Sequence, residues 1–369
     1  MKHLVLLGAG HAHVHLLSTL AAQPMASVKI TLVAPFGRQL YSGMVPGFVA
    51  GHYALEDCVI PLPPLLANTC IEWLQRSAEG LDATSRTLTL DNGSTLGFDV
   101  LSVNSGPVQD RLKIEQVMPG AREHALFVRP IEAFGALWPQ VVTLSQSRPL
   151  RVAVIGGGAA GIELACAVAH RLENSSVTLL TGDTPLAANY PLTVQWRIAR
   201  ALKSRNITVI RESACGIAAG EISLGSGAKL ACDVPLLATG AQAPGWLLDS
   251  GLALDQQGFI AVDEFQRSTS HPAVFAAGDV STRVDRQLAR SGVYAVRAGP
   301  PLAKNLRAVL AGVAPTRYTP QEKTLNLLSL GDKSAVASWG NYSAQGRWVW
   351  WFKNHIDHGF IRRYGRPAS

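Results

Sequence analysis

The stretch that decides the fold is Val152-Ala153-Val154-Ile155-Gly156-Gly157-Gly158-Ala159-Ala160-Gly161. A short apolar run of β type is followed by a glycine-rich turn and then by an alanine-rich segment of helical composition. Gly156, Gly158 and Gly161 have the GxGxxG spacing that lets a backbone approach the pyrophosphate of a dinucleotide at a helix N-terminus. The stretch therefore predicts a strand, a phosphate-binding turn and a helix.

An earlier copy of this pattern lies at the N-terminus. Leu4-Val5-Leu6-Leu7 precedes Gly8-Ala9-Gly10-His11-Ala12-His13, in which His13 stands where the third glycine is expected. Each copy leads, after a gap of helical length, into a second β-type run, at residues 28–33 and 177–180. Two such units predict an α/β fold with two Rossmann-like dinucleotide-binding domains on parallel sheets.

The histidines of the first copy allow two interpretations. His13 must point away from the sheet or widen the helix–strand spacing that a third glycine keeps small, and we expect His11 to donate a hydrogen bond near the pyrophosphate. Alternatively, His11, His13 and His15 could hold a metal ion, because an HxH pair after a strand is a ligand arrangement of some hydrolases. Such a hydrolase site needs further ligands from other strand ends, and we expect no metal.

Neither copy has the acidic residue that closes the second strand of the general pattern and binds the ribose hydroxyls. The first copy has Ala34-Pro35 at this place, and the second has Thr181-Gly182 with Asp183 displaced. The missing acid in the second copy permits the 2′-phosphate of NADPH, but no arginine is obviously placed to bind it. The choice between NADH and NADPH stays open.

Composition excludes several classes of protein. The chain has 369 residues, of which 47% are hydrophobic and 16% charged, so it can form two or three domains with large cores. Residues 347–369 carry much of the net charge of +7. Because the rest of the chain has no basic run, we expect no nucleic-acid partner. Five cysteines without a CxxC pair favour a reducing, cytoplasmic location over a disulfide framework. No apolar run has the length of a transmembrane helix.

Other segments give local signals. Asn92-Gly93 predicts a hairpin turn, and the proline-rich residues 61–64 predict irregular surface chain. Strands are expected near residues 325–330 and 334–339, followed by a helix from about Trp348. In that tail Trp348, Trp351, Phe352, Ile356 and Phe360 recur at helical spacing, with Lys353, Asn354, Asp357 and Arg362 facing elsewhere. Such an aromatic face suits a peripheral membrane contact, a homodimer contact or a lid over the active site.

Together these motifs resemble the pyridine nucleotide-disulfide oxidoreductase superfamily of flavoproteins. Leu237-Ala238-Thr239-Gly240 is similar to the segment that ends the inserted domain of that fold, and Val274-Phe275-Ala276-Ala277-Gly278-Asp279 is similar to its second FAD signature. The resemblance implies an FAD domain at residues 1–115 and 244–318, an inserted NAD(P) domain at 116–243, and a C-terminal α+β domain at 319–369.

The resemblance also implies which residues bind the cofactors. Asp279 would hold the ribityl chain of FAD, and Gly299-Pro300-Pro301-Leu302 would form a turn or kink near the isoalloxazine. The expected contacts of FAD are Gly8, Gly10, His11, Ala12, His13, Ala34, Pro35, Arg38, Met44, Pro46, Ser105, Gly106, Gly278, Asp279, Pro301 and Leu302. The expected contacts of NAD(P)H are Gly156, Gly158, Ala159, Ala160, Gly161, Thr181 and Gly240.

Within the superfamily the chain is more similar to the NADH dehydrogenase type 2-like group, and most to the oxidoreductase module found fused in front of selenide, water dikinase. Residues 40–47, 292–297 and 346–350 carry this similarity. It implies hydride transfer from NAD(P)H to FAD and then to an acceptor, with a quinone as the expected class. Residues 40–50 hold no cysteine where disulfide reductases carry their redox pair. Glu163 matches a catalytic glutamate near the nicotinamide and flavin.

One feature leaves the function open. The stretch Val293–Arg297 lacks the two glutamines that contact quinone in the type 2 group. A flavin-bound redox sensor or partner module with little turnover, with a link to selenium metabolism, is therefore an alternative.

Overall fold

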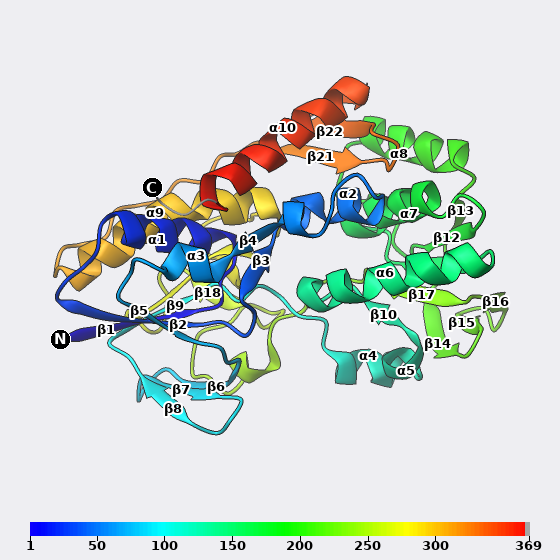
Figure 1. Cartoon of the computed structure of the whole chain (residues 1–369). Helices are drawn as coiled ribbons and strands as arrows, with labels where there is room; N and C mark the ends of the chain where they lie inside the picture. The colour runs from blue at the N-terminus through cyan, green and yellow to red at the C-terminus, as the bar shows by residue number, and fades with distance from the viewer. Residues whose placement is uncertain (366–369) are drawn as a thin grey trace.

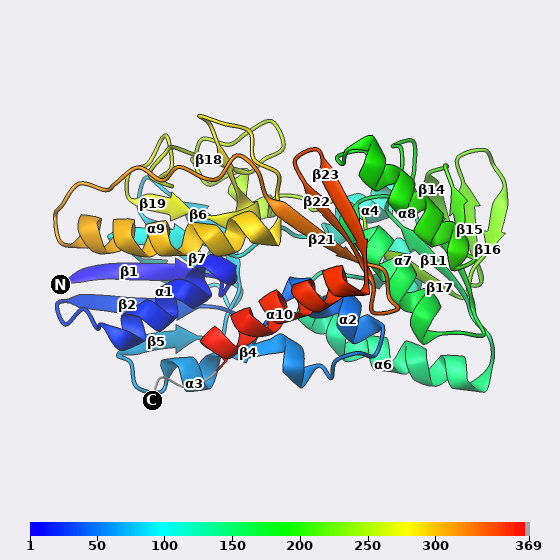
Figure 2. The ribbon, with the colours of Figure 1, turned by 90° about the horizontal axis from the view of Figure 1, so that it is seen from above.

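The computed structural model describes residues 1–365, so the last four residues of the expected C-terminal domain lie outside the described residues. Two parallel-sheet units stand side by side, and the C-terminal helix lies across the junction between them (Figures 1 and 2). The α/β class and the two Rossmann-like units predicted from the glycine turns are confirmed.

The first unit is a five-stranded parallel sheet in the order β19-β9-β1-β2-β5. Leu4 of the central strand pairs with Ile30 on one side and with Val100 on the other, and such a strand is apolar because both its faces are covered. Helices α1 and α9 cover one face (Figure 1). The elements are β1 (Lys2–Leu7), α1 (His11–Ala22), β2 (Val28–Val33), α3 (Leu62–Leu66), β5 (Ile71–Leu74), β9 (Val100–Val103), β19 (Val274–Ala276), η4 (Gly278–Val280) and α9 (Gly292–Leu310).

The second unit repeats this plan with a parallel sheet in the order β10-β17-β11-β12-β13. Helices α6, α7 and α8 lie on the face nearer the C-terminal elements (Figure 1). The elements are α4 (Arg111–Val117), α5 (Ala121–His124), β10 (Leu126–Phe127), α6 (Ile131–Ser147), β11 (Arg151–Ile155), α7 (Ala159–Arg171), β12 (Ser176–Leu180), α8 (Leu192–Ser204), β13 (Thr208–Ile210) and β17 (Val234–Leu237).

Smaller sheets and short helices complete the two units. The Asn92-Gly93 pair follows β7 and leads through a tight turn into β8, as expected of a hairpin. The elements are β3 (Arg38–Leu40), η1 (Ser42–Met44), α2 (Val45–Val49), η2 (Glu56–Cys58), β4 (Val59–Pro61), β6 (Ala78–Asp82), β7 (Thr87–Leu90), β8 (Thr95–Gly97), β14 (Ala214–Ala218), β15 (Glu221–Leu224), β16 (Lys229–Ala231), η3 (Gly245–Leu247), β18 (Ile260–Val262) and β20 (Ser281–Arg283).

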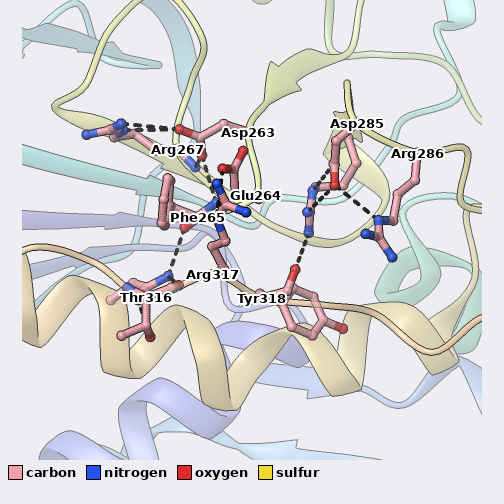
Figure 3. Close-up of polar contacts among 11 residues, drawn as sticks. Asp263, Glu264, Phe265, Arg267, Asp285, Arg286, Thr316, Arg317 and Tyr318 are labelled. Carbon is pink, nitrogen blue, oxygen red and sulfur yellow. Dashed lines mark hydrogen bonds and ion pairs between the residues drawn. The ribbon is translucent and has the colours of Figure 1, made fainter.

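The C-terminal part is an antiparallel sheet of β21 (Leu325–Ser329), β22 (Ala335–Trp339) and β23 (Tyr342–Gly346), followed by α10 (Arg347–Tyr364). A polar network anchors the chain on its way there (Figure 3). Arg283 donates to Tyr318 O at 3.1 Å and pairs with Asp285 at 2.8 Å, while Tyr318 N donates to Glu264 O at 2.8 Å. The segment before β21 is thus fixed to the first unit.

Two local predictions are wrong. Residues 61–64 are not irregular surface chain: Pro61 ends β4, and α3 begins at Leu62, which is fully buried. Prolines are accepted in the first turn of a helix because its N–H groups have no intrahelical partner there. The turn expected at Gly299–Leu302 is not formed, because these residues lie inside the continuous helix α9, whereas the kink expected there as the alternative stays a prediction.

The chain crosses from the first unit to the second a few residues before the expected boundary at 115/116. That boundary falls inside α4, whose Ile114 packs into the core of the second unit with Ala153 and Leu180. The crossing lies instead near Val108, which forms an isolated bridge with Gln242 of the returning chain.

Candidate functional site

The first glycine turn is pressed against the end of β9. Gly8 has φ +86°, and a Cβ there would lie 2.5 Å from Ser105 Cα. Gly10 N donates to Asn104 O at 3.1 Å, and a Cβ at Gly10 would lie 2.5 Å from the same oxygen. Both glycines are therefore required by close backbone approach.

Asn104 is a key residue that the sequence analysis missed. Its Oδ1 accepts hydrogen bonds from Ala12 N and His13 N, both at 3.1 Å, and its Nδ2 donates to Ala277 O at 2.6 Å. One buried amide thus caps α1 and ties it to the strand that precedes Gly278. The only signal for it in the sequence is a polar residue directly after the apolar strand β9.

His13 supports the first glycine turn from the side of strand β9 and does not line the cavity of the first unit. Its ring is fully buried, Nδ1 donates to Gly8 O at 2.5 Å, and Nε2 accepts from Ser102 at 2.8 Å. Burial lowers the pKa of His13 to about 4, so the ring is neutral at pH 7. Of the two expectations for this side chain, pointing away from the sheet is wrong, because the imidazole reaches Ser102 on β9.

A cavity of about 530 Å³ opens at the carboxyl ends of the first unit's strands. This is the place where open α/β sheets bind their ligands. Nine of the expected FAD contacts line it: Gly8, Gly10, His11, Ala34, Pro35, Arg38, Ser105, Gly106 and Asp279.

The other expected FAD contacts lie beside or beneath this cavity. Met44 and Pro46 are buried in η1 and α2, and Leu302 is buried with the core residues that pack around α1. Ala12 is buried at the start of α1, and Pro301 is part of α9. Gly278 has φ +74°, and a Cβ there would lie 2.8 Å from Asn104 Nδ2, so its role is to let the chain turn.

The polar groups of the cavity fit an FAD. His11 Nε2 is buried without a hydrogen-bond partner among residues 1–365, and burial together with the charge of Arg129 lowers the pKa of His11 to about 4. The Arg129 guanidinium makes no hydrogen bond or ion pair within residues 1–365. Burial raises the pKa of Asp279, although Arg129 and Arg290 act against this. The unpaired guanidinium of Arg129 and the half-buried carboxylate of Asp279 suit a ligand with both phosphate and hydroxyl groups.

The second glycine turn is built differently. Gly156 N donates to Leu180 O at 2.8 Å, and a Cβ at Gly161 would overlap Gly156 O. No side chain caps the start of α7, and nothing in the described chain lies near a Cβ placed at Gly158. Free N–H groups at a helix N-terminus form an anion site.

The remaining expected NAD(P)H contacts surround this turn. Thr181 is buried directly after β12, with its Cβ 2.8 Å from a Cβ placed at Gly157. Ala159 and Ala160 form the first turn of α7, and Gly240 lies in the returning link after β17. Arg211, from the neighbouring strand end, donates to Asp183 O at 3.4 Å.

A second missed residue, Gln109, connects the two sites. Its Oε1 accepts from Arg129 N at 2.8 Å, and its Nε2 donates to Leu237 O at 2.9 Å. Gln109 also lines the cavity of the first unit. Its amide therefore fixes the crossing of the chain between the units.

A buried polar cluster lies where α10 crosses the junction. Lys353 Nζ donates to Gly43 O at 2.5 Å and to Asp357 Oδ2 at 2.6 Å, while Glu163 Oε1 accepts from Ser329 N at 2.7 Å. Burial raises the pKa of Glu163 to about 7, although the charge of Lys353 opposes this. Burial alone would lower the pKa of Lys353, but Asp357 and Glu163 raise it, so the ammonium is retained.

Tyr41 joins this cluster to the cavity. Its ring stacks on Phe360 with centroids 4.5 Å apart and lies 5.3 Å from the ring of His11. Burial and the carboxylate of Asp357 raise the pKa of Tyr41 far above its usual value. Lys353 and Asp357 lie away from the exposed aromatic side of α10, as expected, but together with Val349 and Tyr364 they form its buried side.

His11, His13 and His15 do not converge. His15 Nδ1 contacts the hydroxyl of Tyr364 at 3.0 Å, whereas His13 bonds Gly8 and His11 faces the cavity. Within residues 1–365 no three His, Cys, Asp or Glu side chains are grouped so as to hold a metal ion.

Comparison with known proteins agrees with this geometry. The family model for pyridine nucleotide-disulphide oxidoreductases matches residues 2–303. The oxidoreductase ptaL of Pestalotiopsis fici is 26% identical over 94% of both chains. An NADH dehydrogenase-like protein of Mycobacterium tuberculosis is 26% identical over 62% of this chain and 59% of its own length.

Among solved structures, the sulfide:quinone oxidoreductase of Aquifex aeolicus superposes with a TM-score of 0.80 at 18% identity, over 100% of this chain and 93% of that one. This likeness is one of fold. Together with the cavity and the two glycine turns, the family match shows that the chain belongs to the pyridine nucleotide-disulphide oxidoreductase family and is an FAD-dependent oxidoreductase that uses NAD(P)H.

Proposed function

We propose that this protein passes hydride from NAD(P)H to FAD and then delivers the electrons directly to a quinone-like acceptor, without a redox-active disulfide. The observation that carries the proposal is the environment of residues 41–47. Where disulfide reductases place their cysteines, this chain has Tyr41 and Gly43, and both contact buried polar residues of α10. The relatives named for NADH and for quinone support the same donor and acceptor classes.

Cys58 and Cys166, which share a buried core with Met44 and Val45 of this segment, are unsuited to a thiol relay. Cys58, the nearest to this segment, is buried and donates to Ala54 O at 3.4 Å. Burial raises the pKa of Cys58 to about 12, and that of the buried Cys166 on α7 also to about 12. The thiolate is the reactive form of cysteine, so neither thiol is activated at neutral pH.

Glu163 is proposed to hold the proton that the acceptor needs. Reduction of a quinone consumes two electrons and two protons, and a carboxyl group with a pKa near 7 is a suitable proton donor at neutral pH. Lys353 Nζ, fixed by Asp357 and by Gly43 O, lies within electrostatic reach of Glu163. The ammonium would orient an acceptor oxygen and stabilise negative charge on it.

Steady-state oxidation of NAD(P)H with a short-chain ubiquinone tests the proposal, using wild type and the double variant Cys58→Ser/Cys166→Ser. We expect quinone-dependent turnover that is retained in the double variant. A redox sensor or partner module would show FAD reduction without quinone-dependent turnover. Loss of turnover in a folded double variant would indicate a thiol relay. The link to selenium metabolism rests on the sequence resemblance alone, because the cluster of Glu163, Lys353 and Asp357 contains no group specific for selenium.

We further propose that α10 brings the protein to the surface of a membrane, where such acceptors reside. Trp348 and Trp351 are each 64% exposed, and Phe352 and Ile356 are exposed on the same helix. Aromatic residues with flanking Arg347 and Arg362 suit the interface of an anionic bilayer. Across residues 1–365 the helices are all too short or too polar to cross a membrane.

Flotation with vesicles of phosphatidylglycerol and phosphatidylcholine tests this surface. We expect wild type to float with the vesicles and Trp348→Ser/Trp351→Ser to remain at the bottom. Trp196→Ser, which changes an exposed tryptophan of α8, is the matched control. A homodimer through the same face would instead give a doubled mass in solution that the tail variant reduces to a monomer.

A further inference from the structure

A second, smaller pocket lies next to the FAD cavity, and the proposed function does not use it. Strands β18 and β20 and helix α9 contribute Val262, Thr282 and Ala298 to its walls. Its volume is about 50 Å³. A buried water needs only about 10–15 Å³ of such space. Asp279 lines this pocket as well as the FAD cavity, so the two spaces share this residue.

Gln266 reaches the pocket from a tight turn. Its φ is +65°, a left-handed value that residues other than glycine rarely adopt. Asp263 holds the turn, because its backbone oxygen accepts from Gln266 N at 3.0 Å. Its Oδ1 accepts from Phe265 N and Arg267 N, both at 2.9 Å (Figure 3). The side chain that this turn carries into the pocket is only 2% exposed.

The side-chain amide of Gln266 has one satisfied end and one unsatisfied end. Nε2 donates to Ala298 O of α9 at 3.0 Å, whereas Oε1 is buried without a hydrogen-bond partner among residues 1–365. Exchanging the two atoms would not remove the problem, because Ala298 O can only accept and therefore needs the nitrogen. A buried amide oxygen without a donor is unfavourable, so the pocket requires a donor at Oε1.

Asp279 is the second free acceptor in the pocket. Its carboxylate makes no hydrogen bond or ion pair within residues 1–365. The two arginines of the pocket wall are already paired. Arg283 bonds Asp285 at 2.8 Å, and Arg290 bonds Asp255 at 2.9 Å. Two free acceptors in a small space suit an uncharged ligand with two donors, and water is the smallest such ligand.

We propose that this pocket binds an ordered water molecule that donates to Gln266 Oε1 and to the carboxylate of Asp279, and so holds that carboxylate in position for FAD. A carboxylate has two oxygens, so one can accept from the water while the other stays available to the ribityl chain expected in the FAD cavity. A bridging water is nearly as favourable as a direct hydrogen bond. Gln266 is then a positioning residue that acts through Asp279.

This inference rests on FAD in the cavity and does not depend on the acceptor. The first test is the rate at which the diluted holoenzyme releases FAD, followed by flavin fluorescence. We expect Gln266→Met to release FAD about tenfold faster than wild type, since a buried contact to a charged group is lost. Gln256→Met changes an exposed glutamine of a neighbouring turn and should release FAD at the wild-type rate.

Asp279→Asn separates the bridge from a merely structural role of Gln266. If both residues act through one water, adding Gln266→Met to Asp279→Asn should change the release rate by less than about threefold. Loss of the bond to Ala298 O alone would accelerate release equally with Asp279 and with Asn at this position. Equal acceleration in the two backgrounds therefore overturns the proposal, as does a wild-type release rate in Gln266→Met.

The second measurement is the electron density of the pocket in crystals of the wild-type holoenzyme, which needs no variant to fold. We expect one ordered water within hydrogen-bond distance of both Gln266 Oε1 and the Asp279 carboxylate. An empty pocket, or a protein donor placed directly on Oε1, overturns the proposal. Failure of quinone-dependent turnover in wild type would contradict the proposed function and leave both measurements valid.

Discussion

The two glycine turns of this protein share one backbone plan and differ in how it is completed. In the first turn, Asn104 caps the helix, and His13 fills the space of the third glycine by bonding Gly8 O. In the second turn, the helix start has no side-chain cap, and Gly161 leaves no room for any side chain. The first turn is thus braced by the protein itself, as suits a cofactor that stays bound. The second leaves its N–H groups free, as suits a nucleotide that binds and leaves at each turnover.

The largest effect should follow from exchanging the third position of the second turn. In Gly161→His the new Cβ overlaps Gly156 O, so the turn cannot keep its shape. We expect FAD to be retained but no measurable reduction by NAD(P)H, since small displacements of reacting groups already cost about 10²-fold in rate. Anaerobic stopped-flow absorbance measures this. Normal reduction in Gly161→His would mean that the second turn does not hold the nicotinamide nucleotide.

Two residues after His13 and Gly161, α1 has His15 and α7 has Glu163. His15 contacts Tyr364 of α10, and Glu163 lies near Lys353 of the same helix. We expect Glu163→Gln to lower quinone-dependent kcat by about 10²-fold, as for loss of a general acid. Because the pKa of Glu163 is about 7, the wild-type rate should fall as pH rises through 7, and the variant should lack this limb.

His15→Gln is the matched control for that experiment, since the ring of His15 contacts only the uncharged hydroxyls of Tyr364 and Thr19 within residues 1–365. We expect its kcat and its pH profile to remain close to those of wild type. An unchanged pH profile in Glu163→Gln would remove this glutamate from the proton path.

Asn104→Ala should remove the hydrogen bonds that hold the first glycine turn in place. The substitution leaves Ala12 N, His13 N and Ala277 O without their buried partner, which costs about 3 kcal/mol of unfolding free energy. Urea unfolding and FAD content measure the effect. Ser105→Ala, at an exposed side chain beside it, should change stability by no more than about 0.5 kcal/mol. Equal stability of the two variants would show that the cap is not needed.

The smallest effect is a pH dependence carried by His13. The folded pKa of about 4 lies below the unfolded value of 6.5, so the unfolded chain binds the proton first as pH falls. The contribution of His13 to the free energy of unfolding is full above pH 6.5 and decreases by about 1.4 kcal/mol per pH unit between pH 6.5 and pH 4. In His13→Gln this contribution disappears. Unfolding midpoints between pH 7 and 5 measure the difference, and parallel curves for the two proteins would contradict the burial of a neutral imidazole.

The sequence was most informative where function depends on the backbone. Glycine spacing and apolar runs predicted both parallel sheets, both turns and the hairpin at Asn92-Gly93, because these features follow from neighbouring residues. It was least informative where side chains distant in the chain meet. Asn104 reaches α1, Arg129 reaches the vicinity of Asp279, and Lys353 reaches Gly43.

Helix α10 shows most clearly that contacts between distant residues cannot be predicted from the sequence pattern. Its spacing predicted an aromatic side and a polar side, and both exist, but the aromatic residues Trp348 and Trp351 are exposed while Lys353 and Asp357 are buried. A Lys–Asp pair at i,i+4 can be buried only where further partners satisfy it. Here Gly43 O accepts from the lysine, and Tyr41 lies against the aspartate. These partners lie about 310 residues earlier in the chain, where no periodicity can reveal them.

The most direct test of the account is an anaerobic titration of the holoenzyme with NADH and with NADPH, followed by addition of a quinone. We expect one equivalent of the preferred nucleotide to reduce the flavin completely and one equivalent of quinone to restore its oxidised spectrum. A requirement for two equivalents of nucleotide would reveal a second two-electron centre such as a disulfide. Reduced flavin that quinone does not reoxidise would contradict direct transfer to this acceptor.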